Sequence, residues 1–255
     1  MIPLPAIFLG APIAHRAYHD RSLGRPENSR GAIRAAIEAG YNIEIDVQLS
    51  ADGIAVVFHD YELRRLTHSS GRVRALSAER LGAVRLRDCD EGIPTLREVL
   101  ELVAGRVGIL IEIKDQDGAM GDAVGPLEAD VAGALRGYVG PVAVMSFNPN
   151  SIAAFSALSP ETPVGLTTSG YTVEGWPLLL ASTRNRLREI PDIDRVAASF
   201  ISHEAAYLDC ARVSELKSQG IAVLCWTIRS PEAECEARRI AQNVTFERYA
   251  ADLPA

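Results

Sequence analysis

The chain alternates short apolar segments of strand length with longer segments of helical periodicity, and this rhythm limits its fold more than any other feature. Eight segments read as strands, at residues 10–15, 44–46, 108–114, 141–147, 163–167, 195–200, 221–227 and 243–246. Strands that alternate with helices favour a parallel sheet. Eight such units in 255 residues predict an α/β protein, a (β/α)8 TIM barrel.

The alternative to a barrel is an open, doubly wound sheet. Its usual nucleotide-binding signatures are missing from the sequence, which contains neither G-x-G-x-x-G nor a Walker pattern. No linker or shift in composition divides the chain. We therefore expect residues 1–255 to form one domain.

A β-hairpin is expected in residues 42–60, NIEIDVQLSADGIAVVFHD. Asp52-Gly53 stands between two apolar-alternating runs, which is a strong hairpin signal. A two-residue turn at this dipeptide would put His59 directly opposite Asp46, on the same face of the sheet. A slip of one residue in the pairing would break this alignment.

The first strand of this hairpin carries two acidic side chains. Glu44 and Asp46 are two residues apart, so both carboxylates point to one face, to which His59 adds an imidazole. Carboxylates so close repel each other unless a cation neutralises them, and hard Mg²⁺ or Ca²⁺ prefers such oxygens. The alternative is a solvated strand face that carries these residues without any ligand.

Other chemistry-bearing side chains also fall at strand ends. In a TIM barrel the reactive groups lie at the carboxyl ends of the strands. Glu112 and Lys114 share a face at one such end, and the hairpin can bring its own second strand back to the barrel mouth. The residues expected there are His15, Glu44, Asp46, Glu112, Lys114, Ser146, Phe147 and Trp226.

The segment after the hairpin, residues 61–92, is too long for a plain strand-to-helix connection. It carries seven arginines and few large apolar residues. We expect a loop with short helical turns that forms a polar cap at the barrel mouth.

Composition excludes several classes of protein. A net charge of −7 argues against a nucleic-acid partner. The N-terminal MIPLPAIFLGAP is broken by prolines and lacks a basic region, so it is a poor signal peptide. No run is long enough to span a bilayer, which argues against stable membrane insertion. The four cysteines show no paired spacing and fit reduced thiols of a cytoplasmic protein.

Eleven short motifs occur in a fixed order between residues 12 and 228, and together they are far more specific than any one alone. They are His15-Arg16, Pro26-Glu27-Asn28, Glu44-x-Asp46, Asp52-Gly53, His59-Asp60, Leu63 with Arg65-x-Thr67, Gly71, Ile93-Pro94-Thr95-Leu96, Glu112-x-Lys114, Ser146-Phe147 and Trp226-Thr227. In this set the chain resembles the glycerophosphodiester phosphodiesterase family, of the phosphatidylinositol-phospholipase-C-like phosphodiesterase superfamily.

The resemblance implies a TIM barrel that hydrolyses glycerophosphodiesters to sn-glycerol 3-phosphate and an alcohol, with one divalent cation, Mg²⁺ or Ca²⁺. The implied metal ligands are Glu44, Asp46 and Glu112. The implied general acid and base are His15 and His59. The implied substrate-binding residues are Arg16, Glu27, Lys114, Phe147 and Trp226. For Glu27 the resemblance leaves two roles open, as a further ligand of the cation or as a partner of a substrate hydroxyl. Of the other histidines, we expect His19, His68 and His203 at the surface, with His19 nearest the site.

Two departures from the family pattern stand out. Ala17 replaces the glycine that usually follows His-Arg, and residues 243–248, Asn-Val-Thr-Phe-Glu-Arg, replace a Gly-Ile-Ile-Thr-Asp type of strand. Glu247 then stands where the family has aspartate. Two alternative functions stay open: a lysophospholipase D-type enzyme, for which the loop at 170–180 is the one candidate acyl-binding patch, and a non-catalytic relative that binds glycerophosphodiesters.

Overall fold

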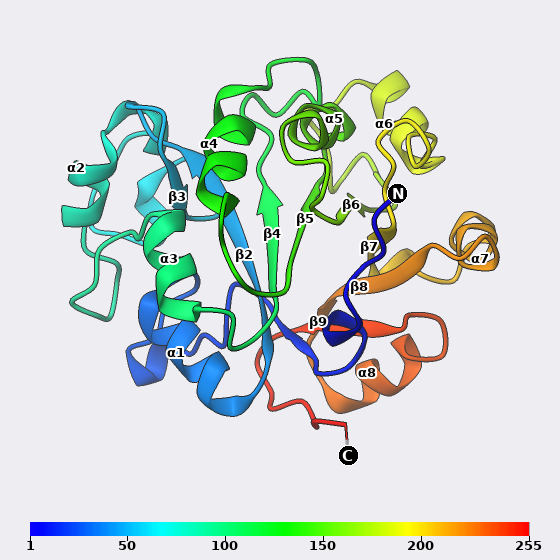
Figure 1. Ribbon diagram of the computed structural model, residues 1–255, viewed down its shortest axis with the longest axis horizontal. Coiled ribbons are helices and arrows are strands. Elements are labelled where there is room, and N and C mark those ends of the chain that lie inside the picture. The colour runs from blue at the N-terminus through cyan, green and yellow to red at the C-terminus, as the bar shows by residue number, and fades with distance from the viewer. Residues whose placement is uncertain (255) are drawn as a thin grey trace.

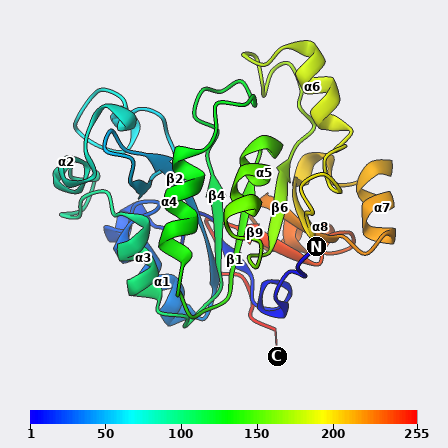
Figure 2. The same cartoon turned by 45° about the horizontal axis from the view of Figure 1, so that its top comes forward.

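The structure is a computed structural model that describes residues 1–254 of the chain. Eight parallel strands close into a barrel, and helices surround it (Figure 1; Figure 2). The order around the barrel is β1-β9-β8-β7-β6-β5-β4-β2, and β2 pairs with β1 to close it. The predicted (β/α)8 barrel is thereby confirmed.

The strands lie close to the predicted apolar segments, with one exception. Their bounds are β1 (Ile13–Ala14), β2 (Asn42–Leu49), β3 (Ala55–Val57), β4 (Ile109–Ile113), β5 (Val142–Ser146), β6 (Val164–Thr168), β7 (Phe200–Glu204), β8 (Ala222–Ile228) and β9 (Asn243–Phe246). Among the strands of residues 1–254, only β3 is antiparallel to its neighbour, and it lies on β2 outside the closed barrel.

Several of the helices begin at residues whose side chains cap them, as their sequences predict. Their bounds are α1 (Arg30–Ala39), α2 (Ala78–Ala83), α3 (Leu96–Val103), α4 (Pro126–Leu135), α5 (Pro149–Leu158), α6 (Ala181–Arg188), α7 (Ala211–Ser218) and α8 (Pro231–Ala237). Ser29 caps α1, and Thr95 forms a capping box with Glu98 at the start of α3. Gly40 ends α1 with a φ of 77°, a conformation that glycine adopts without strain.

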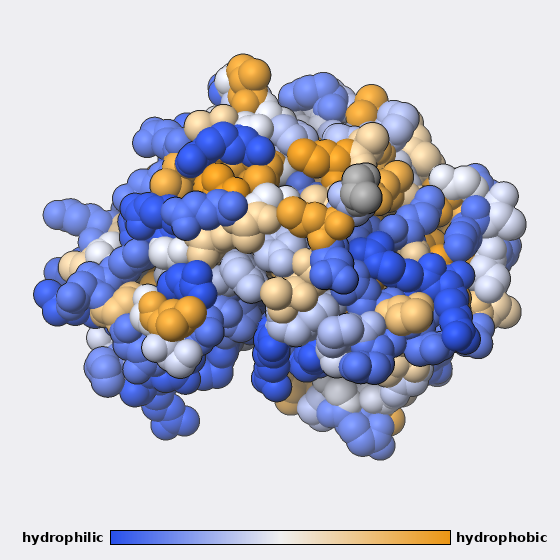
Figure 3. Space-filling model, turned by 90° about the horizontal axis from the view of Figure 1, so that it is seen from below, coloured by the Kyte–Doolittle hydropathy of each residue, from blue (hydrophilic) through white to orange (hydrophobic). Residues whose placement is uncertain are grey.

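Apolar side chains close the end of the barrel opposite the strand tips. The 3₁₀ helix Ala6–Leu9 inserts Phe8 against Leu110, Phe200 and Leu224 inside the barrel. Figure 3 views the side on which α1, α8 and the C-terminal end lie, where apolar groups gather toward the middle of a mostly polar face. No helix among residues 1–254 has the length and apolarity needed to cross a bilayer.

The hairpin forms, but its predicted register is wrong by one residue. Val47 pairs with Val57, and the Phe58 amide donates to the Asp46 carbonyl at 2.9 Å. The turn therefore contains three residues, 51–53, and Gly53 takes the positive φ of 79° that such a turn requires. Asp46 does not pair with His59, which follows the end of β3 and reaches the barrel mouth from a loop instead.

The seventh barrel strand also differs from its prediction. The segment 195–200 contributes only Phe200 to a strand, because β7 runs on to Glu204. This shift places His203 in the barrel wall, where it is buried and its Nδ1 lies 2.8 Å from the Thr168 hydroxyl. The prediction that His203 lies at the surface is therefore wrong.

The cap at residues 61–92 contains the short helical turns that were expected, namely Leu63–Arg65, Val73–Ala75 and α2. It is less polar than expected, because it encloses an apolar cluster of its own. The members of this cluster are Val56, Phe58, Leu63, Leu66, Val73, Leu81, Leu86 and Ile93. Since two of them lie on or beside β3, the cap is packed onto the hairpin that leads to His59.

Candidate active site

Three buried carboxylates meet at the carboxyl ends of β2 and β4. Asp46 and Glu112 are paired neighbours on these two strands, and Glu44 lies two residues before Asp46 on the same face. One oxygen from each carboxylate lies within 4.8 Å of the others. Burial, together with the charges of Asp46 and Glu112, raises the pKa of Glu44 well above its usual value. Ionised Glu44 is thus poorly accommodated unless more positive charge is added.

Two cationic side chains supply part of that charge. The Lys114 ammonium lies 2.7 Å from Glu112 Oε1 and 3.3 Å from Asp46 Oδ1. Arg16 Nε lies 3.5 Å from Asp46 Oδ2, and the Arg16 amide donates to Glu44 Oε2 at 2.8 Å. Burial alone would lower the pKa of Lys114, but the two carboxylates more than offset it and raise that pKa. Three carboxylates still outnumber these two cations.

The carboxylate cluster fits a divalent cation of the hard type. All of its donors are oxygen atoms, as Mg²⁺ and Ca²⁺ prefer, and they already lie within reach of one ion. The charge left over after Lys114 and Arg16, together with the raised pKa of Glu44, favours the addition of positive charge. Glu27 is not part of this cluster.

Each of two histidines is held through Nδ1 by a carboxylate at the mouth of the barrel. His15 Nδ1 lies 2.7 Å from Glu247 Oε2, and His59 Nδ1 lies 2.7 Å from Asp60 Oδ1. Each carboxylate fixes the orientation of its imidazole ring through Nδ1. Proton exchange with a substrate is therefore left to Nε2. Burial lowers the pKa of His15, against the opposing effect of Glu247, so the ring is neutral near pH 7.

A network of salt bridges links Arg16, at the carboxylate cluster, to Asp60, which holds His59. Glu27 accepts hydrogen bonds from Arg16 at 2.7 Å and from Arg65 at 2.7 and 2.8 Å. Arg65 also donates to Asp60 at 2.6 Å. The structure therefore places Glu27 behind Arg16, where it anchors the guanidinium and does not line the cavity.

Of the other residues expected at the site, all but Ser146 line one cavity of about 870 Å³. Ser146 is buried in the barrel wall, where its hydroxyl donates to the Ile113 carbonyl at 2.7 Å. An aromatic wall bounds the cavity, in which Phe147 lies 5.6 Å from Trp226 and 4.9 Å from Trp176, measured between ring centroids. The Trp226 indole donates to the Ser202 carbonyl at 3.0 Å, which fixes the ring. Trp176 comes from the loop after β6 and was not predicted as a site residue.

The cavity also has hydroxyl groups with unused hydrogen-bonding capacity. The hydroxyls of Thr167, Ser202 and Thr245 are buried and have no partner among residues 1–254. All three residues line the cavity. A polar ligand can therefore satisfy them, since buried polar groups are normally hydrogen-bonded.

Comparison with known proteins decides the family. The profile of the Glycerophosphoryl diester phosphodiesterase family matches residues 15–252. The chain belongs to this family. It is 32% identical over 177 residues to a glycerophosphodiester phosphodiesterase of Caldanaerobacter subterraneus, with 66% of this chain and 70% of that one covered. YhdW of Bacillus subtilis (strain 168) is 27% identical over 246 residues, which cover 93% of each chain.

Solved structures agree with this result. A phosphodiesterase of Oleispira antarctica, in complex with the product sn-glycerol-3-phosphate, superposes with a TM-score of 0.77 and 26% identity. The alignment covers 95% of this chain and 94% of that one. The chain is thus a phosphodiesterase of the glycerophosphoryl diester family, and the resemblance found in its motifs is confirmed.

Within this phosphodiesterase, sequence reasoning missed Gln48 altogether and noted Trp176 and Glu247 without predicting their contacts in the site. Gln48 continues the alternation of Glu44 and Asp46 into the cavity, a signal that was available. Trp176 lies in a loop, and the sequence of a loop does not predict whether a side chain points into the cavity. Glu247 was noticed as a departure from the family pattern, but its contact with His15 depends on the pairing of β1 with β9.

Proposed function

We propose that this phosphodiesterase hydrolyses glycerophosphodiesters to sn-glycerol 3-phosphate and an alcohol with one divalent cation, Mg²⁺ or Ca²⁺, and a pair of histidines. The observation that carries the proposal is that three buried carboxylates and two histidines held by acids line the same cavity. We also propose a cytoplasmic location, which rests on the sequence alone.

The proposed cation site consists of Glu44, Asp46 and Glu112. When bound there, the cation offsets negative charge that develops on the phosphoryl oxygens in the transition state. Lys114 and Arg16, which already lie beside these carboxylates, bind the phosphate and orient it. The wall of Phe147 and Trp226 holds the glycerol carbons.

The two histidines divide the proton transfers. One accepts a proton at Nε2 from the attacking oxygen, which belongs to water or to the neighbouring glycerol hydroxyl. The other donates a proton to the departing alkoxide. Imidazole suits both tasks because it can accept and donate a proton at the same nitrogen, and each transfer contributes about 10² to 10⁴ in rate. Glu247 and Asp60 hold His15 and His59 in the orientation that this exchange requires.

One surface feature favours a second substrate class, the lysophospholipids. Val173, Leu178 and Leu180 have exposed side chains on the loop that also carries Trp176, which lines the cavity. The cavity of about 870 Å³ leaves room beyond the aromatic wall. An acyl chain on the glycerol could extend past Trp176 onto these residues, as in a lysophospholipase D-type reaction.

The test is a screen with purified protein in which glycerophosphocholine, glycerophosphoethanolamine and glycerophosphoglycerol are supplied with Mg²⁺ or Ca²⁺, with and without EDTA. Lysophosphatidylcholine is supplied in a parallel reaction, in which release of choline is measured. We expect release of glycerol 3-phosphate that EDTA abolishes and that restored cation recovers. Asp46→Asn is the matched inactive control, because it keeps the side-chain volume and removes one ligand charge.

Three other results would change the conclusion. Full activity in EDTA would reject the metal dependence. Binding of glycerophosphodiesters without turnover would favour the non-catalytic alternative. Turnover of lysophosphatidylcholine with little turnover of glycerophosphocholine would favour the second substrate class.

A further inference from the structure

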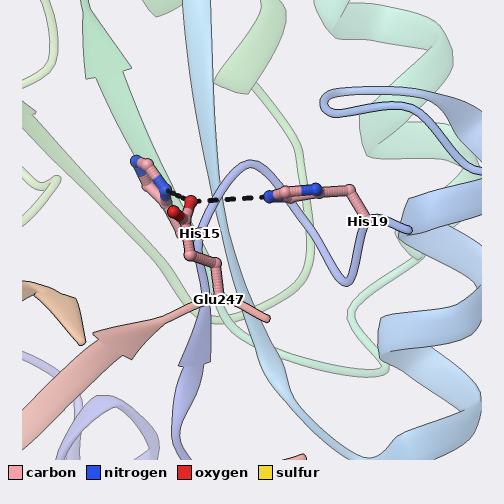
Figure 4. A group of neighbouring side chains, drawn as sticks. All are labelled: His15, His19 and Glu247. Carbon is pink, nitrogen blue, oxygen red and sulfur yellow. Dashed lines mark hydrogen bonds and ion pairs between the residues drawn. The ribbon is translucent and has the colours of Figure 1, made fainter. Parts of the chain in front are cut away.

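Two histidines and one glutamate form a second cluster of potential metal ligands, outside the three carboxylates. His15 Nδ1 lies 2.7 Å from Glu247 Oε2, and His19 Nε2 lies 3.6 Å from the same oxygen. Figure 4 shows the carboxylate between the two imidazole rings, with both rings directed at it. One donor atom from each residue lies within 4.8 Å of the other two.

The topology of the barrel produces this cluster. Ala14 pairs with Phe246 at the ends of β1 and β9, so His15 and Glu247 directly follow two adjacent strands. After His15, Arg16 and Ala17 take positive φ values of 51° and 63°, which turn the chain back sharply. His19 thereby returns its ring to the end of β9, where it faces Glu247.

The His19 ring has a nitrogen that the structure leaves without a partner. Its Nε2 is buried and makes no hydrogen bond with any group in residues 1–254, since 3.6 Å to Glu247 is too long for one. Buried polar atoms rarely stay unsatisfied. An ion located between the two rings would bond this nitrogen.

We propose that His15, His19 and Glu247 bind a transition-metal ion of the Zn²⁺ type, and that this ion inhibits the enzyme. Two imidazoles and one carboxylate are a common zinc ligand set that leaves a fourth position for water. With Zn–ligand distances of about 2.0–2.2 Å, tetrahedral ligand atoms lie roughly 3.3–3.5 Å apart. The two histidine–glutamate separations of 2.7 and 3.6 Å lie on either side of this range, and all three donor atoms lie within 4.8 Å of one another, so side-chain adjustment can complete the site.

Nearby arginines orient the glutamate and do not block the site. Arg229 Nε donates to Glu247 Oε1 at 2.7 Å, and Arg248 Nε lies 3.4 Å from the same oxygen. Oε2 therefore stays directed at the histidines, as carboxylate ligands of metals are usually held by outer hydrogen bonds. Both arginine side chains are more than half exposed, at 53% and 71%, so solvent screens their repulsion of a cation.

The two clusters differ in the metal that they favour. Carboxylate oxygens alone suit Mg²⁺ and Ca²⁺, whereas imidazole nitrogens suit zinc and its neighbours in the transition series. Saturating Mg²⁺ therefore fills the site of Glu44, Asp46 and Glu112 and leaves the histidine cluster available. Zinc bound in the presence of excess Mg²⁺ then reports on the second site.

Inhibition follows from the position of the proton on His15. An ionised Glu247 can only accept a hydrogen bond, so in the metal-free state His15 Nδ1 donates its proton to Glu247 and Nε2 of the neutral ring carries a lone pair. A metal on Nδ1 needs that lone pair, so the ring proton moves to Nε2 and the neutral ring can no longer accept one there. This step rests on the proposed catalytic role of His15, whereas binding of the ion does not.

The experiment compares wild type, His19→Ala and, as a matched control, His68→Ala, which removes a histidine from the exposed part of the cap. Zn²⁺ is titrated under saturating Mg²⁺, and bound zinc is measured by equilibrium dialysis alongside phosphodiesterase activity. We expect His19→Ala to weaken zinc binding and inhibition at least about tenfold, and His68→Ala to behave as wild type. Without zinc, His19→Ala should keep the activity of wild type.

Two outcomes would overturn the inference. One is that wild type binds no zinc once Mg²⁺ is saturating. The other is that His19→Ala binds zinc as tightly as wild type, which would assign zinc to other ligands. If the protein has no phosphodiesterase activity, the dialysis still tests the site, so failure of the proposed function is distinguishable from failure of this inference.

Discussion

Replacing Lys114 tests most directly how the negative charge of the carboxylate cluster is offset. The Lys114 ammonium lies 2.7 Å from Glu112 Oε1 and 3.3 Å from Asp46 Oδ1, and the side chain is only 15% exposed. Lys114→Met keeps the apolar stem and removes the charge. Without a metal, two buried carboxylates would then face each other with no ammonium between them.

The expected loss follows from that geometry. Removing one partner from a buried ion pair costs about 3–5 kcal/mol, because it leaves an uncompensated charge. In EDTA we therefore expect Lys114→Met to lower the free energy of unfolding by roughly this amount. A bound divalent cation replaces the missing charge, and the loss of a neighbouring ammonium favours its binding. The stabilisation by Mg²⁺ should thus exceed that of wild type by at least about 1.4 kcal/mol, a factor of ten in affinity.

The assay is urea unfolding of wild type and variant in EDTA and in saturating Mg²⁺. Lys217 is the only other lysine of the chain, and its exposed ammonium donates to the Ile240 carbonyl. Lys217→Met is therefore the matched control and should change stability by less than about 0.5 kcal/mol. If Lys114→Met lost the same free energy with and without Mg²⁺, the ammonium and the cation would not share the same carboxylates, and the reasoning would be refuted.

Three further predictions concern other parts of the molecule. His59→Ala should lower kcat about 10²- to 10⁴-fold, while the Mg²⁺ affinity measured by calorimetry stays unchanged. Loss of both activity and Mg²⁺ affinity would instead assign His59 as a metal ligand. Burial lowers the pKa of His15 below 6.5, so the unfolded chain takes up a proton first and stability falls as pH decreases below 6.5. Urea unfolding across pH should show a smaller fall for His15→Asn, and equal slopes would contradict this. Leu81→Ala, in the buried cluster of the cap, should cost about 2–5 kcal/mol and speed proteolysis within residues 61–92, whereas Leu178→Ala, 92% exposed, should do neither.

The sequence predicted those parts of the site that depend on local spacing. Glu44 and Asp46 share a face because side chains alternate along a strand, whatever the rest of the fold does. Glu112 and Lys114 follow the same rule on β4, and parallel strands bring both pairs to one end of the barrel. These are the residues whose placement required only strand periodicity and the (β/α)8 topology.

The hairpin shows where such reasoning fails. Asp52-Gly53 fits a two-residue and a three-residue turn equally well, since glycine can supply the positive φ in both. The hairpin that forms has the three-residue turn, and in it Phe58 packs into the apolar cluster of the cap. Because this cluster includes residues as distant as Ile93, the hairpin sequence alone could not predict the packing. Even so, His59 lines the cavity, because the chain leaves β3 beside the barrel mouth.

Contacts between distant segments were beyond the reach of the motifs. Glu247 contacts His15 across 232 positions of sequence, and only the pairing of β1 with β9 brings them together. A glutamate in place of the family's aspartate is one methylene longer, and its two oxygens reach His15 on one side and Arg229 on the other. The departure at the last strand therefore affects the histidine that we propose as a catalyst.

The buried carboxylates at the barrel mouth lower the stability of the metal-free fold, and the same carboxylates form the proposed cation site. Phe8 and its apolar neighbours close one end of the barrel, together with hydrogen bonds from the amides of Asn42 and Asn243, while the other end holds buried carboxylates whose ionisation is opposed by burial. Lys114 and Arg16 offset part of the negative charge of these carboxylates but do not neutralise all of it. A site that was completely balanced by its own side chains would gain nothing from a divalent cation. The incomplete balance around Glu44 is therefore the feature that allows metal binding to stabilise the fold and to prepare the site for an anionic substrate.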